Sequence, residues 1–481
     1  MQGIWTTGHI RAAEERLLAR TPDGALMRKA AFGLAVHTAA LLTERIGGVV
    51  GARVVLLAGA GNNGGDALWA GAFLQRRGVG VTAVLLAPER AHAAGLAALR
   101  RAGGRVSVDP AADIAAADLV VDGIVGLSAH GPLRPDAAEL VELITAPVVA
   151  VDLPSGVEPD TGAVDGPAVT ADVTVTFGAR KPVHVLGEGY VRSGRVVLVD
   201  IGLRPELGDP DLIRLGIEDV GALWPVPGPS DDKYSQGVTG IAAGSARYPG
   251  AAVLASTSAV LATSGMVRYA GSAADAVLAR WPEAVTTGSV ADAGRVQAWV
   301  AGPGLGTGAG SREVLAHLLG IGVPVCVDAD AITMLAEHPE LWDARQPGTE
   351  IVLTPHAGEF ARLTGAEVGA DRVGAARSAA RTFDAVVLLK GHTTVVAAPD
   401  GRTLVNPART AWPATAGSGD VLSGLIGALL AAGREPFLAA GAAAFLHELA
   451  AELAADGAPA PASRLARAIP DAIRTVRAAT G

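Results

Sequence analysis

The sequence has few of the residues on which several common kinds of protein depend. It holds one cysteine, Cys326, so no disulfide can form within the chain and a zinc site built from thiolates would need other partners. Because Cys326 lies in the apolar run 323–327, we expect it to be a small buried side chain. Charged residues make up 18% of the chain and hydrophobic residues 50%, which excludes a disordered protein.

Basic residues are also in deficit. There are 39 Lys and Arg against 48 Asp and Glu, a net charge of −9, which fits poorly with binding to a nucleic-acid backbone. The first residues lack a basic stretch followed by an apolar one, and no uninterrupted apolar run reaches the roughly 18 residues that span a bilayer. We therefore expect a soluble, cytoplasmic protein with no nucleic-acid and no membrane partner, and helices rich in small residues favour a homo-oligomer.

Two residue types are so rare that their positions are informative. The four lysines are Lys29, Lys181, Lys233 and Lys390, and the three asparagines are Asn62, Asn63 and Asn406. A GC-rich genome would explain why lysine and asparagine are rare, but not the positions at which the remaining ones occur.

Short apolar strands alternate with helical segments in both halves of the chain. This alternation is typical of βαβ units, in which helices cover both faces of a parallel sheet. Strands are expected at 53–58, 80–86, 119–121, 148–151 and 173–177, then at 237–243, 296–301, 323–327, 351–353, 385–389 and 394–397; helices are expected at 67–77, 137–144 and about 421–456.

A proline-rich segment separates the halves. Residues 224–232 read WPVPGPSDD, and three prolines within five residues cannot continue a helix or a central strand. We therefore expect a three-layer, Rossmann-like α/β domain over 1–215, a linker over 216–232 and a second α/β domain over 233–481.

The strand at 53–58 runs directly into a glycine-rich loop, GAGNNGGD at 59–66. Gly59, Gly61 and Gly64 satisfy G-x-G-x-x-G, a pattern that lets backbone N–H groups approach a phosphate at a helix N-terminus. A nicotinamide-dependent dehydrogenase would also need an acid after the second strand, where only Glu89 stands. That class and a ligand-free tight turn stay open as alternatives, but Asn62, Asn63 and Asp66 add oxygens that suit a hard cation.

Two further strands end in aspartate. Asp122 follows the strand at 119–121, ahead of the loop 126–132, GLSAHGP, and Asp152 begins DLPSG after the strand at 148–151. As turn or cap residues these aspartates would be ordinary. Because open α/β sheets bind ligands at the carboxyl ends of their strands, we expect the two aspartates and the glycine-rich loop to converge.

Together GNNGGD, VDG, VAVDLPSG and TFGARKP at 176–182 resemble the NAD(P)H-hydrate epimerases, which interconvert the R and S epimers at C6 of hydrated NADH or NADPH. The resemblance implies that Asp152 transfers the proton and that Asn63, Asp122 and Ser155 bind K⁺. Ala67 and the Ser128–His130 stretch depart from the family pattern. The residues implied to hold the hydrate are Asn62, Asn63, Gly64, Gly65, Asp66, Gly126, Leu127, Ser128, Ala129, His130, Gly131, Pro132 and Asp152.

The second half carries another glycine-rich loop before a helix, GSGD at 417–420. Such a loop forms a backbone anion hole at the positive end of the helix dipole. A simple phosphate cradle would not favour Asp420, whereas a base that takes a proton from a hydroxyl attacking a phosphoryl group would be a carboxylate. Asp420 could instead be an ordinary helix cap. Lys390, at a strand end beside Gly391, is either a phosphate contact or a solvated lysine.

TPHAGEF at 354–360, KGHTTVV at 390–396 and GSGDVLSG at 417–424 resemble the ribokinase-like superfamily and, more narrowly, the ADP- or ATP-dependent NAD(P)H-hydrate dehydratases. The match runs from about Lys233 to the final helix. The implied reaction is phosphorylation of the S epimer at its C6 hydroxyl, followed by loss of phosphate.

The same resemblance implies Mg²⁺ on the nucleotide phosphates and Asp420 as the base. Thr333, where the family has asparagine, and Ser418 depart from the pattern. The hydrate would contact Ala251, Gly304, Gly306, His356 and Asp420, and the nucleotide would contact Lys390, Gly391, His392, Thr393, Thr394 and Gly419.

Both resemblances concern one damaged cofactor, so the sequence predicts a bifunctional NAD(P)H-hydrate repair enzyme. The alternative is a ribokinase-type small-molecule kinase whose first domain is a nucleotide-binding regulatory module.

Overall fold

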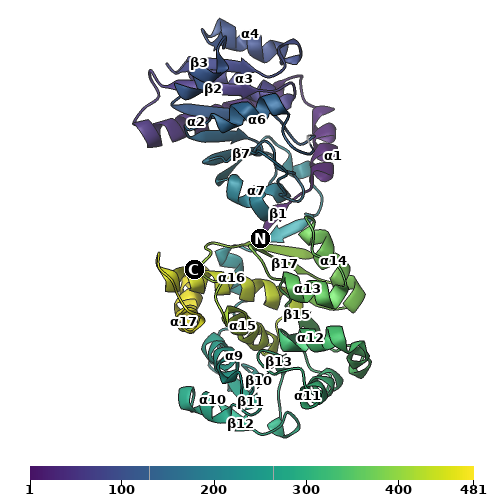
Figure 1. The fold of residues 1–481 in the computed structure, drawn as a ribbon. Coiled ribbons are helices and arrows are strands. Elements are labelled where there is room, and N and C mark those ends of the chain that lie inside the picture. Colours follow the sequence, from purple (N-terminus) through teal and green to yellow (C-terminus); the bar gives the residue numbers. More distant parts are fainter. Residues whose placement is uncertain (129, 264, 481) are drawn as a thin grey trace. The chain divides into compact units, whose positions relative to one another are not determined.

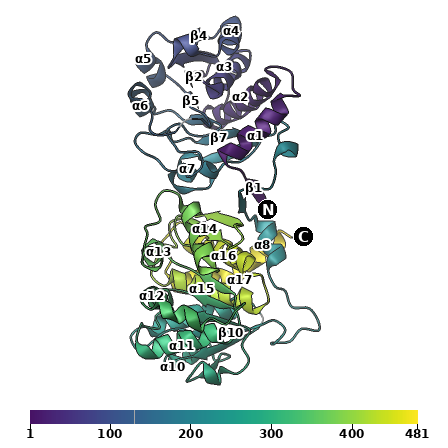
Figure 2. The same cartoon turned by 90° about the vertical axis from the view of Figure 1, so that its right-hand side faces the viewer.

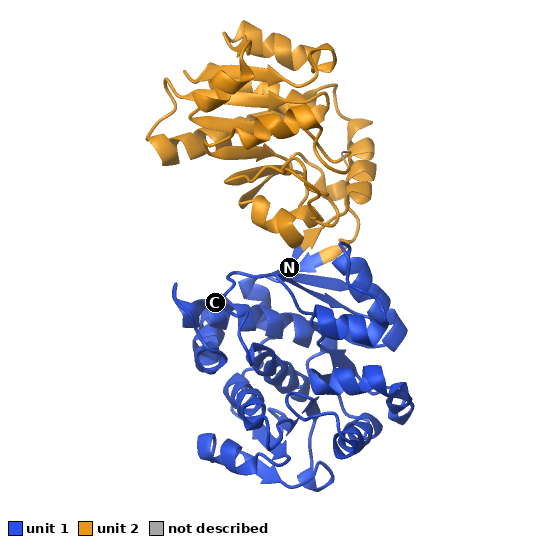
Figure 3. Ribbon diagram, viewed as in Figure 1, with its two compact units in different colours: residues 1–2, 213–481 blue, residues 3–212 orange. Residues whose placement is uncertain are grey.

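The computed structural model describes residues 1–128, 130–263 and 265–480. It divides into two compact units, one of residues 3–212 and one of residues 1–2 and 213–481 (Figure 3). The first contains all the motifs that resemble the epimerases, and the second contains those that resemble the dehydratases. Each unit is an α/β fold, as the alternation of strands and helices predicts.

The sheet of the unit 3–212 is parallel and has the strand order β4-β3-β2-β5-β6-β7-β8. The chain passes from β2 outward to β3 and β4 and then returns to β5 on the other side of β2. The switch point between β2 and β5 is where an open α/β sheet binds its ligand. The strands are β2 (Arg53–Ala58), β3 (Gly80–Leu85), β4 (Arg105–Val106), β5 (Leu119–Gly123), β6 (Val148–Val151), β7 (Val173–Phe177) and β8 (Arg195–Val199).

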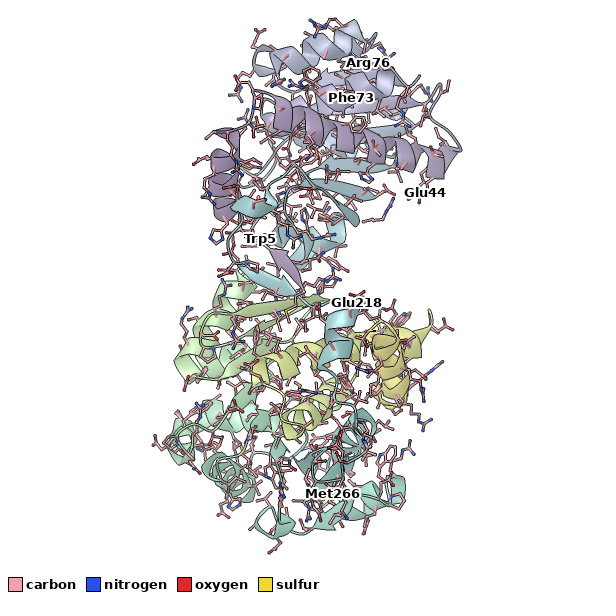
Figure 4. The ribbon with its side chains drawn as sticks, turned by 180° about the vertical axis from the view of Figure 1, so that it is seen from behind. Trp5, Glu44, Phe73, Arg76, Glu218 and Met266 are labelled. Atoms are coloured by element: carbon pink, nitrogen blue, oxygen red, sulfur yellow. The ribbon has the colours of Figure 1, made fainter. Side chains whose placement is uncertain are left out.

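Helices cover both faces of this sheet, because alternate residues of β2 enter different cores. Val54 and Leu56 pack in one core with α2 (Ala25–Ile46) and α3 (Asn62–Gln75). Val55 and Leu57 pack in the other with α5 (Pro110–Ala115) and α6 (Pro135–Glu142). Phe73 of α3 (Figure 4) meets Phe32 of α2 edge to face, with ring centroids 5.7 Å apart. The other helices are α1 (Thr7–Leu18), α4 (Ala93–Arg101) and α7 (Gly187–Arg192).

The sheet of the second unit runs in the order β9-β18-β17-β16-β15-β14-β13-β10-β11-β12. It is parallel from β12 to β16, and β17 is antiparallel to both its neighbours. The carboxyl ends of β10 and β13 to β16 therefore share one edge. The strands are β9 (Leu212–Arg214), β10 (Val238–Ala242), β11 (Met266–Ala270), β12 (Val285–Thr287), β13 (Ala298–Ala301), β14 (Val325–Val327), β15 (Ile351–Leu353), β16 (Val386–Leu389), β17 (Thr393–Ala397) and β18 (Thr403–Pro407), with β1 at Gln2–Ile4.

In this unit α15 (Ser418–Ala431) and α16 (Pro436–Ala455) pack on one face of the sheet, and α11 to α14 lie on the other (Figures 1 and 2). The helical segment expected at 421–456 is thus two helices, interrupted near Gly433 and Pro436. Cys326 is fully buried in β14, which confirms its expected role. The remaining helices are α8 (Ile217–Leu223), α9 (Pro249–Ala262), α10 (Ala274–Arg280), α11 (Ala309–Gly320), α12 (Asp330–Glu337), α13 (Ala357–Thr364), α14 (Arg372–Phe383) and α17 (Ala462–Ala478).

Part of the segment predicted as a linker is ordered on the second unit. Its helix α8 packs against α17, and Trp224, which follows α8, is buried and donates a hydrogen bond from Nε1 to the Ala262 carbonyl over 3.0 Å. The proline-rich residues 225–232 have no helix or strand.

Among the described residues, α2 and α16 are long and apolar enough to cross a membrane by length and composition. In α16, 78% of the apolar stretch is buried inside the unit, and in α2 44% is buried. A buried core helix passes the same test, and α16 packs against α15 and α17 within its unit.

Candidate active sites

The glycine-rich loop between β2 and α3 lies at the switch point of the first sheet. A Cβ on Gly59 would stand 1.9 Å from the Ile124 carbonyl oxygen, and one on Gly64 would stand 2.1 Å from the Gly59 carbonyl oxygen. Only glycine permits so close an approach of two backbones. Asn63 and Asp66 are buried at the start of α3, whereas Asn62 is exposed.

The three residues predicted to bind K⁺ lie together. Asp122 is fully buried and accepts hydrogen bonds from Ser155, from the backbone N–H over 2.8 Å and from Oγ over 2.6 Å. Asn63 donates from Nδ2 to the Val125 and Val151 carbonyls over 2.8 and 2.7 Å, so its Oδ1 faces the Gly126 backbone. Burial raises the pKa of Asp122, against the hydrogen bonds that favour its charged form.

Asp152 follows β6 in a left-handed turn, with φ +72°, which non-glycine residues rarely adopt. Its Oδ1 accepts hydrogen bonds from Lys181 Nζ over 2.5 Å and from Thr176 Oγ1 over 2.9 Å. Lys181 and Asp152 are 1% and 5% exposed, so this is a buried ion pair. Oδ2 of Asp152 makes no hydrogen bond within the described part of the chain and is free to accept a proton.

A neutral histidine supports this turn. His184 Nε2 lies 2.9 Å from the Asp152 carbonyl oxygen, while its Nδ1 accepts a hydrogen bond from the Lys181 backbone N–H over 3.1 Å. Burial, and next the charge of Lys181, lower the pKa of His184 to about 3. His184 therefore stays uncharged at neutral pH and positions both members of the ion pair.

The predicted hydrate-binding loop 126–132 borders this site through its first residues. The Leu127 carbonyl accepts a hydrogen bond from Arg11 Nη2 over 2.6 Å, and Gly126 lies beside Asn63. His130 Nδ1 pairs with Glu158 over 2.9 Å, and Ser128, Gly131 and Pro132 are exposed. Ala129 lies outside the described residues.

The second candidate site lies at the carboxyl edge of the other sheet. Gly417, with φ +82°, starts α15 and places Gly419 and Asp420 in its first turn. Asp420 is partly buried, and burial, followed by the charges of Asp328 and Asp330, raises its pKa to about 7. This is the range in which a carboxylate works best as a general base at neutral pH.

Lys390 lies directly after β16. Asp328, which directly follows β14, holds it beside the glycine-rich loop. Lys390 Nζ donates to Asp328 Oδ1 over 2.7 Å, while Ser423 of α15 donates to Asp328 Oδ2 over 2.7 Å. A Cβ on Gly419 would lie 3.5 Å from Lys390 Nζ. Burial opposes the charge of Lys390, but Asp328 and Glu359 outweigh it and raise the lysine pKa.

Two other strand ends contribute to the same edge. His356 caps α13 after β15, and its backbone N–H donates to Glu359 Oε2 over 2.8 Å. After β13, the Gly306 backbone N–H donates to Asp330 Oδ2 over 2.8 Å. A Cβ on Gly304 would meet Ala251 Cβ at 2.8 Å, so these two predicted substrate contacts touch.

The five nucleotide residues predicted at 390–394 are not equivalent. Gly391 and His392 are exposed, whereas Thr393 and Thr394 are buried in β17. The structure also adds three residues that the prediction left out: Asp328, Glu359 and Ser423. Each stands in a quoted motif or directly after a strand. Nothing in the spacing showed that Asp328 and Glu359 would pair with Lys390, or that Ser423 would donate a hydrogen bond to Asp328.

A cavity of about 300 Å³ opens at the same edge of the sheet. Its walls include Ser245, Ser272 and Ser289, which follow β10, β11 and β12, and also Leu305, between the predicted contacts Gly304 and Gly306. Among the described residues, glycines, serines and small apolar side chains line it, and no charged side chain does.

Both halves of the chain are similar to known proteins. Residues 239–472 match the family described as NAD(P)H-hydrate dehydratase, and residues 23–183 match the family described as YjeF-related protein N-terminus. A ribokinase-like superfamily protein of Enterococcus faecalis aligns with 55% of this chain and 96% of its own, with a TM-score of 0.50 and 20% identity. The class is thus a two-domain α/β enzyme with a ribokinase-like C-terminal domain.

Two relatives cover both domains. The bifunctional NAD(P)H-hydrate repair enzyme Nnr of Mycobacterium tuberculosis is 58% identical over 436 residues, 90% of each chain. The enzyme of the same name from Mycobacterium leprae is 55% identical over 483 residues, 100% of each chain. The chain belongs to the family of bifunctional NAD(P)H-hydrate repair enzymes.

Proposed function

We propose that the first domain interconverts the R and S epimers of hydrated NADH and NADPH, and that the second uses ADP or ATP to dehydrate the S epimer to NAD(P)H. The observation that carries the proposal is the buried Asp152–Lys181 pair at the carboxyl ends of β6 and β7. A buried ion pair is costly to desolvate, and a regulatory nucleotide-binding module would not need one. This favours two catalytic domains over a kinase with a regulatory module.

In the epimerase domain, Asp152 exchanges a proton with the substrate through its free Oδ2. Asn62–Asp66 and the loop 126–132 hold the hydrated dinucleotide, since both adjoin Asp152 at the carboxyl ends of β2, β5 and β6. The start of α3 favours a substrate phosphate by its helix dipole.

In the dehydratase domain, Asp420 takes the proton of the C6 hydroxyl as that oxygen attacks the terminal phosphoryl group. Loss of phosphate from C6 and of a proton from C5 then restores the double bond of the dihydronicotinamide. Gly419 and the stretch Lys390–Thr394 hold the nucleotide, with Lys390 kept charged by Asp328. Ala251, Gly304, Gly306 and His356 contact the hydrate, and the adjoining cavity receives the rest of the dinucleotide.

Two cations complete the proposal. Asn63, Asp122 and Ser155 would hold K⁺ in the epimerase domain: Asp122 is fully buried and forms no ion pair with any described residue, so a cation would balance its charge. Mg²⁺ would enter the dehydratase domain with the nucleotide and neutralise its phosphates, because the described residues contain no group of three or more His, Cys, Asp or Glu suited to a metal.

The test is to supply the purified R hydrate without nucleotide and to follow the S hydrate by chromatography, with K⁺ and with Na⁺. The chain should form the S hydrate faster with K⁺, and Asn63→Ala should weaken the K⁺ dependence. No conversion by the wild-type chain would contradict the epimerase assignment. An unchanged K⁺ titration in the variant would contradict the ligand set alone.

We further infer that residues 1–215 and 233–481 carry the two activities, on either side of the segment 216–232. The protein works as a soluble, cytoplasmic homo-oligomer. The outward side of α2 supports self-association, because Phe32 and Val36 are 59% and 37% exposed on it. Light scattering coupled to size-exclusion chromatography gives the number of subunits.

A further inference from the structure

One carboxyl group of the first site has no hydrogen-bond partner among the described residues. Asp66, on α3, is 6% exposed, and its Oδ1 is buried without a hydrogen bond in the described part of the chain. Burial, then the charges of Asp152 and Glu14, raise the pKa of Asp66 well above its ordinary value. Since a buried carboxylate needs donors or a cation, Asp66 is stable here as the neutral acid, with a proton to give.

Glu14 brings a third carboxyl to the same place from α1. Burial raises its pKa first; the charge of Asp152 raises it further, while Lys181 and Arg11 lower it. Its helix is fixed to the loops of the site. Thr7 donates from N and Oγ1 to Asp160 over 2.8 and 2.6 Å, and Arg11 donates to the Leu127 carbonyl.

Epimerisation at C6 needs both an acid and a base. C6 carries a hydroxyl group and is bonded to the ring nitrogen N1, so the hydrate is a hemiaminal. To invert C6 the enzyme must break one of these bonds and form it again on the other face, which moves one proton on and another off. Asp152 supplies the base, and Lys181 stabilises its carboxylate. The group that supplies the second proton, the acid, is still to be assigned.

We propose that Asp66 is the proton donor opposite the Asp152–Lys181 pair, and that Glu14 is a positioning residue that keeps the proton on Asp66. The inference rests on the epimerase function proposed above. Of these two residues only Asp66 touches the substrate, and Glu14 acts through Asp66 by the repulsion of its negative charge.

The step balances without a co-reactant. Asp152 takes the hydroxyl proton, the oxygen forms C6=O, the C6–N1 bond breaks, and N1 takes the proton of Asp66. Rotation about C5–C6 turns the other face of the aldehyde towards N1. N1 then attacks C6 and returns its proton to Asp66, and Asp152 returns its proton to the oxygen. Both carboxyl groups end as they began.

The charged and titratable groups around Asp66 set the pH dependence. As the pH rises through the pKa of Asp66 the acid is lost, so the epimerase rate should fall on the alkaline side. The substitution Glu14→Gln removes a negative charge, lowers the pKa of Asp66 and moves the fall in rate to lower pH. The charges that act on Asp66 are those of Asp152 after β6 and Glu14 on α1. Around these, Arg11 and Lys181 act on Glu14, the neutral His184 lies beside the Asp152–Lys181 pair, and His92 before α4 lies next to Gly65.

The test measures R-to-S conversion across pH in the full chain. Asp66→Asn keeps the shape of the neutral acid and should lower the rate by about 10²–10⁴-fold, with KM changed little. Glu14→Gln should move the alkaline fall of the epimerase pH profile to lower pH. Below that fall the variant should keep most of the wild-type rate. Glu15→Gln, one residue along α1 and exposed, is the matched control and should change nothing. In H₂¹⁸O the product should gain no label.

Thermal unfolding of each variant separates loss of chemistry from loss of fold, and Asp66→Glu, which keeps a transferable proton, should retain more rate than Asp66→Asn. A folded Asp66→Asn variant that keeps its rate within a few-fold would overturn the proposal. A Glu14→Gln profile that drops uniformly without a shift, or ¹⁸O uptake at each turnover, would do the same. If the wild-type chain itself fails to convert the R hydrate, the proposed epimerase function fails instead.

Discussion

Each candidate site has a non-glycine residue with positive φ where a strand ends. Asp152 has φ +72° after β6, and Ala329 has φ +51° after β14. Such a residue costs about 1–3 kcal/mol, so neighbouring contacts must hold it. At Asp152 these are the bonds to Lys181 and His184. Ala329 lies between Asp328, which binds Lys390, and Asp330, which binds the Gly306 backbone. The turn at Asp152 places its own carboxylate at the edge of the first sheet, and the turn at Ala329 places those of Asp328 and Asp330 at the edge of the second.

The acid–base state of Asp420 predicts the pH dependence of the dehydratase. A base must be ionised, and the pKa of Asp420 is about 7, raised by burial and by Asp328. The kcat/KM for nucleotide-dependent recovery of the reduced-nicotinamide absorbance should therefore fall as the pH drops below about 7. Asp420→Asn should lower it by about 10²–10⁴-fold and abolish that limb, while R-to-S conversion in the same chain continues. A profile flat from pH 5 to 9 would refute the base assignment.

At the scale of helices, the anion-hole helix α15 depends on close packing against α9. A Cβ on Gly424 would stand 2.0 Å from Ser258 Oγ and 2.2 Å from the Ala255 carbonyl oxygen. Both contacts lie on α9, whose small residues let the two helices meet. The abundance of glycine and alanine thus has a structural consequence: it sets how closely α15, which carries Gly419 and Asp420 in its first turn, packs against α9.

Gly424→Ala should therefore destabilise the second domain by about 1–3 kcal/mol, the usual cost of overpacking. Its thermal midpoint should drop by about 2–4 °C for each kcal/mol, measured by calorimetry. Gly250→Ala, on α9 itself, is the control, since nothing lies within 4 Å of its added Cβ. Equal midpoints for the two variants would show that α9 and α15 can move apart at no cost.

At the scale of the whole molecule, the two chemistries use separate edges of separate sheets. The hydrate formed in one domain can reach the other by diffusion, so the two activities should complement each other between chains. With mixed epimers and ATP, Asp152→Asn should stop near the initial S fraction, and Asp420→Asn should restore almost no NAD(P)H in the same time. An equal mixture of the two variants should convert everything, as followed by absorbance. A mixture that stops at the S fraction would mean that epimer transfer requires both sites in one chain.

The central parallel strands were the most predictable part of the fold. The expected strands at 53–58, 148–151, 173–177 and 351–353 coincide with β2, β6, β7 and β15, because strands buried on both faces are continuous apolar runs. Strands such as β11, β12 and β18 were missed. Their sequences, MVRYA, VTT and TLVNP, are short or mixed in polarity and become strands through pairing with neighbours.

The sequence by itself determined that the chain has two α/β domains, and it showed which loops and strand-end residues carry their motifs: the paired asparagines, the three aspartates 122, 152 and 420, and Lys390. Only the tertiary structure decided the partners. Lys181 meets Asp152 across 29 positions, Lys390 meets Asp328 across 62, and Glu14 reaches the site from α1. The reason is physical: a parallel sheet brings the carboxyl ends of distant segments to one edge, and strand order, which no local pattern encodes, selects the side chains that meet there.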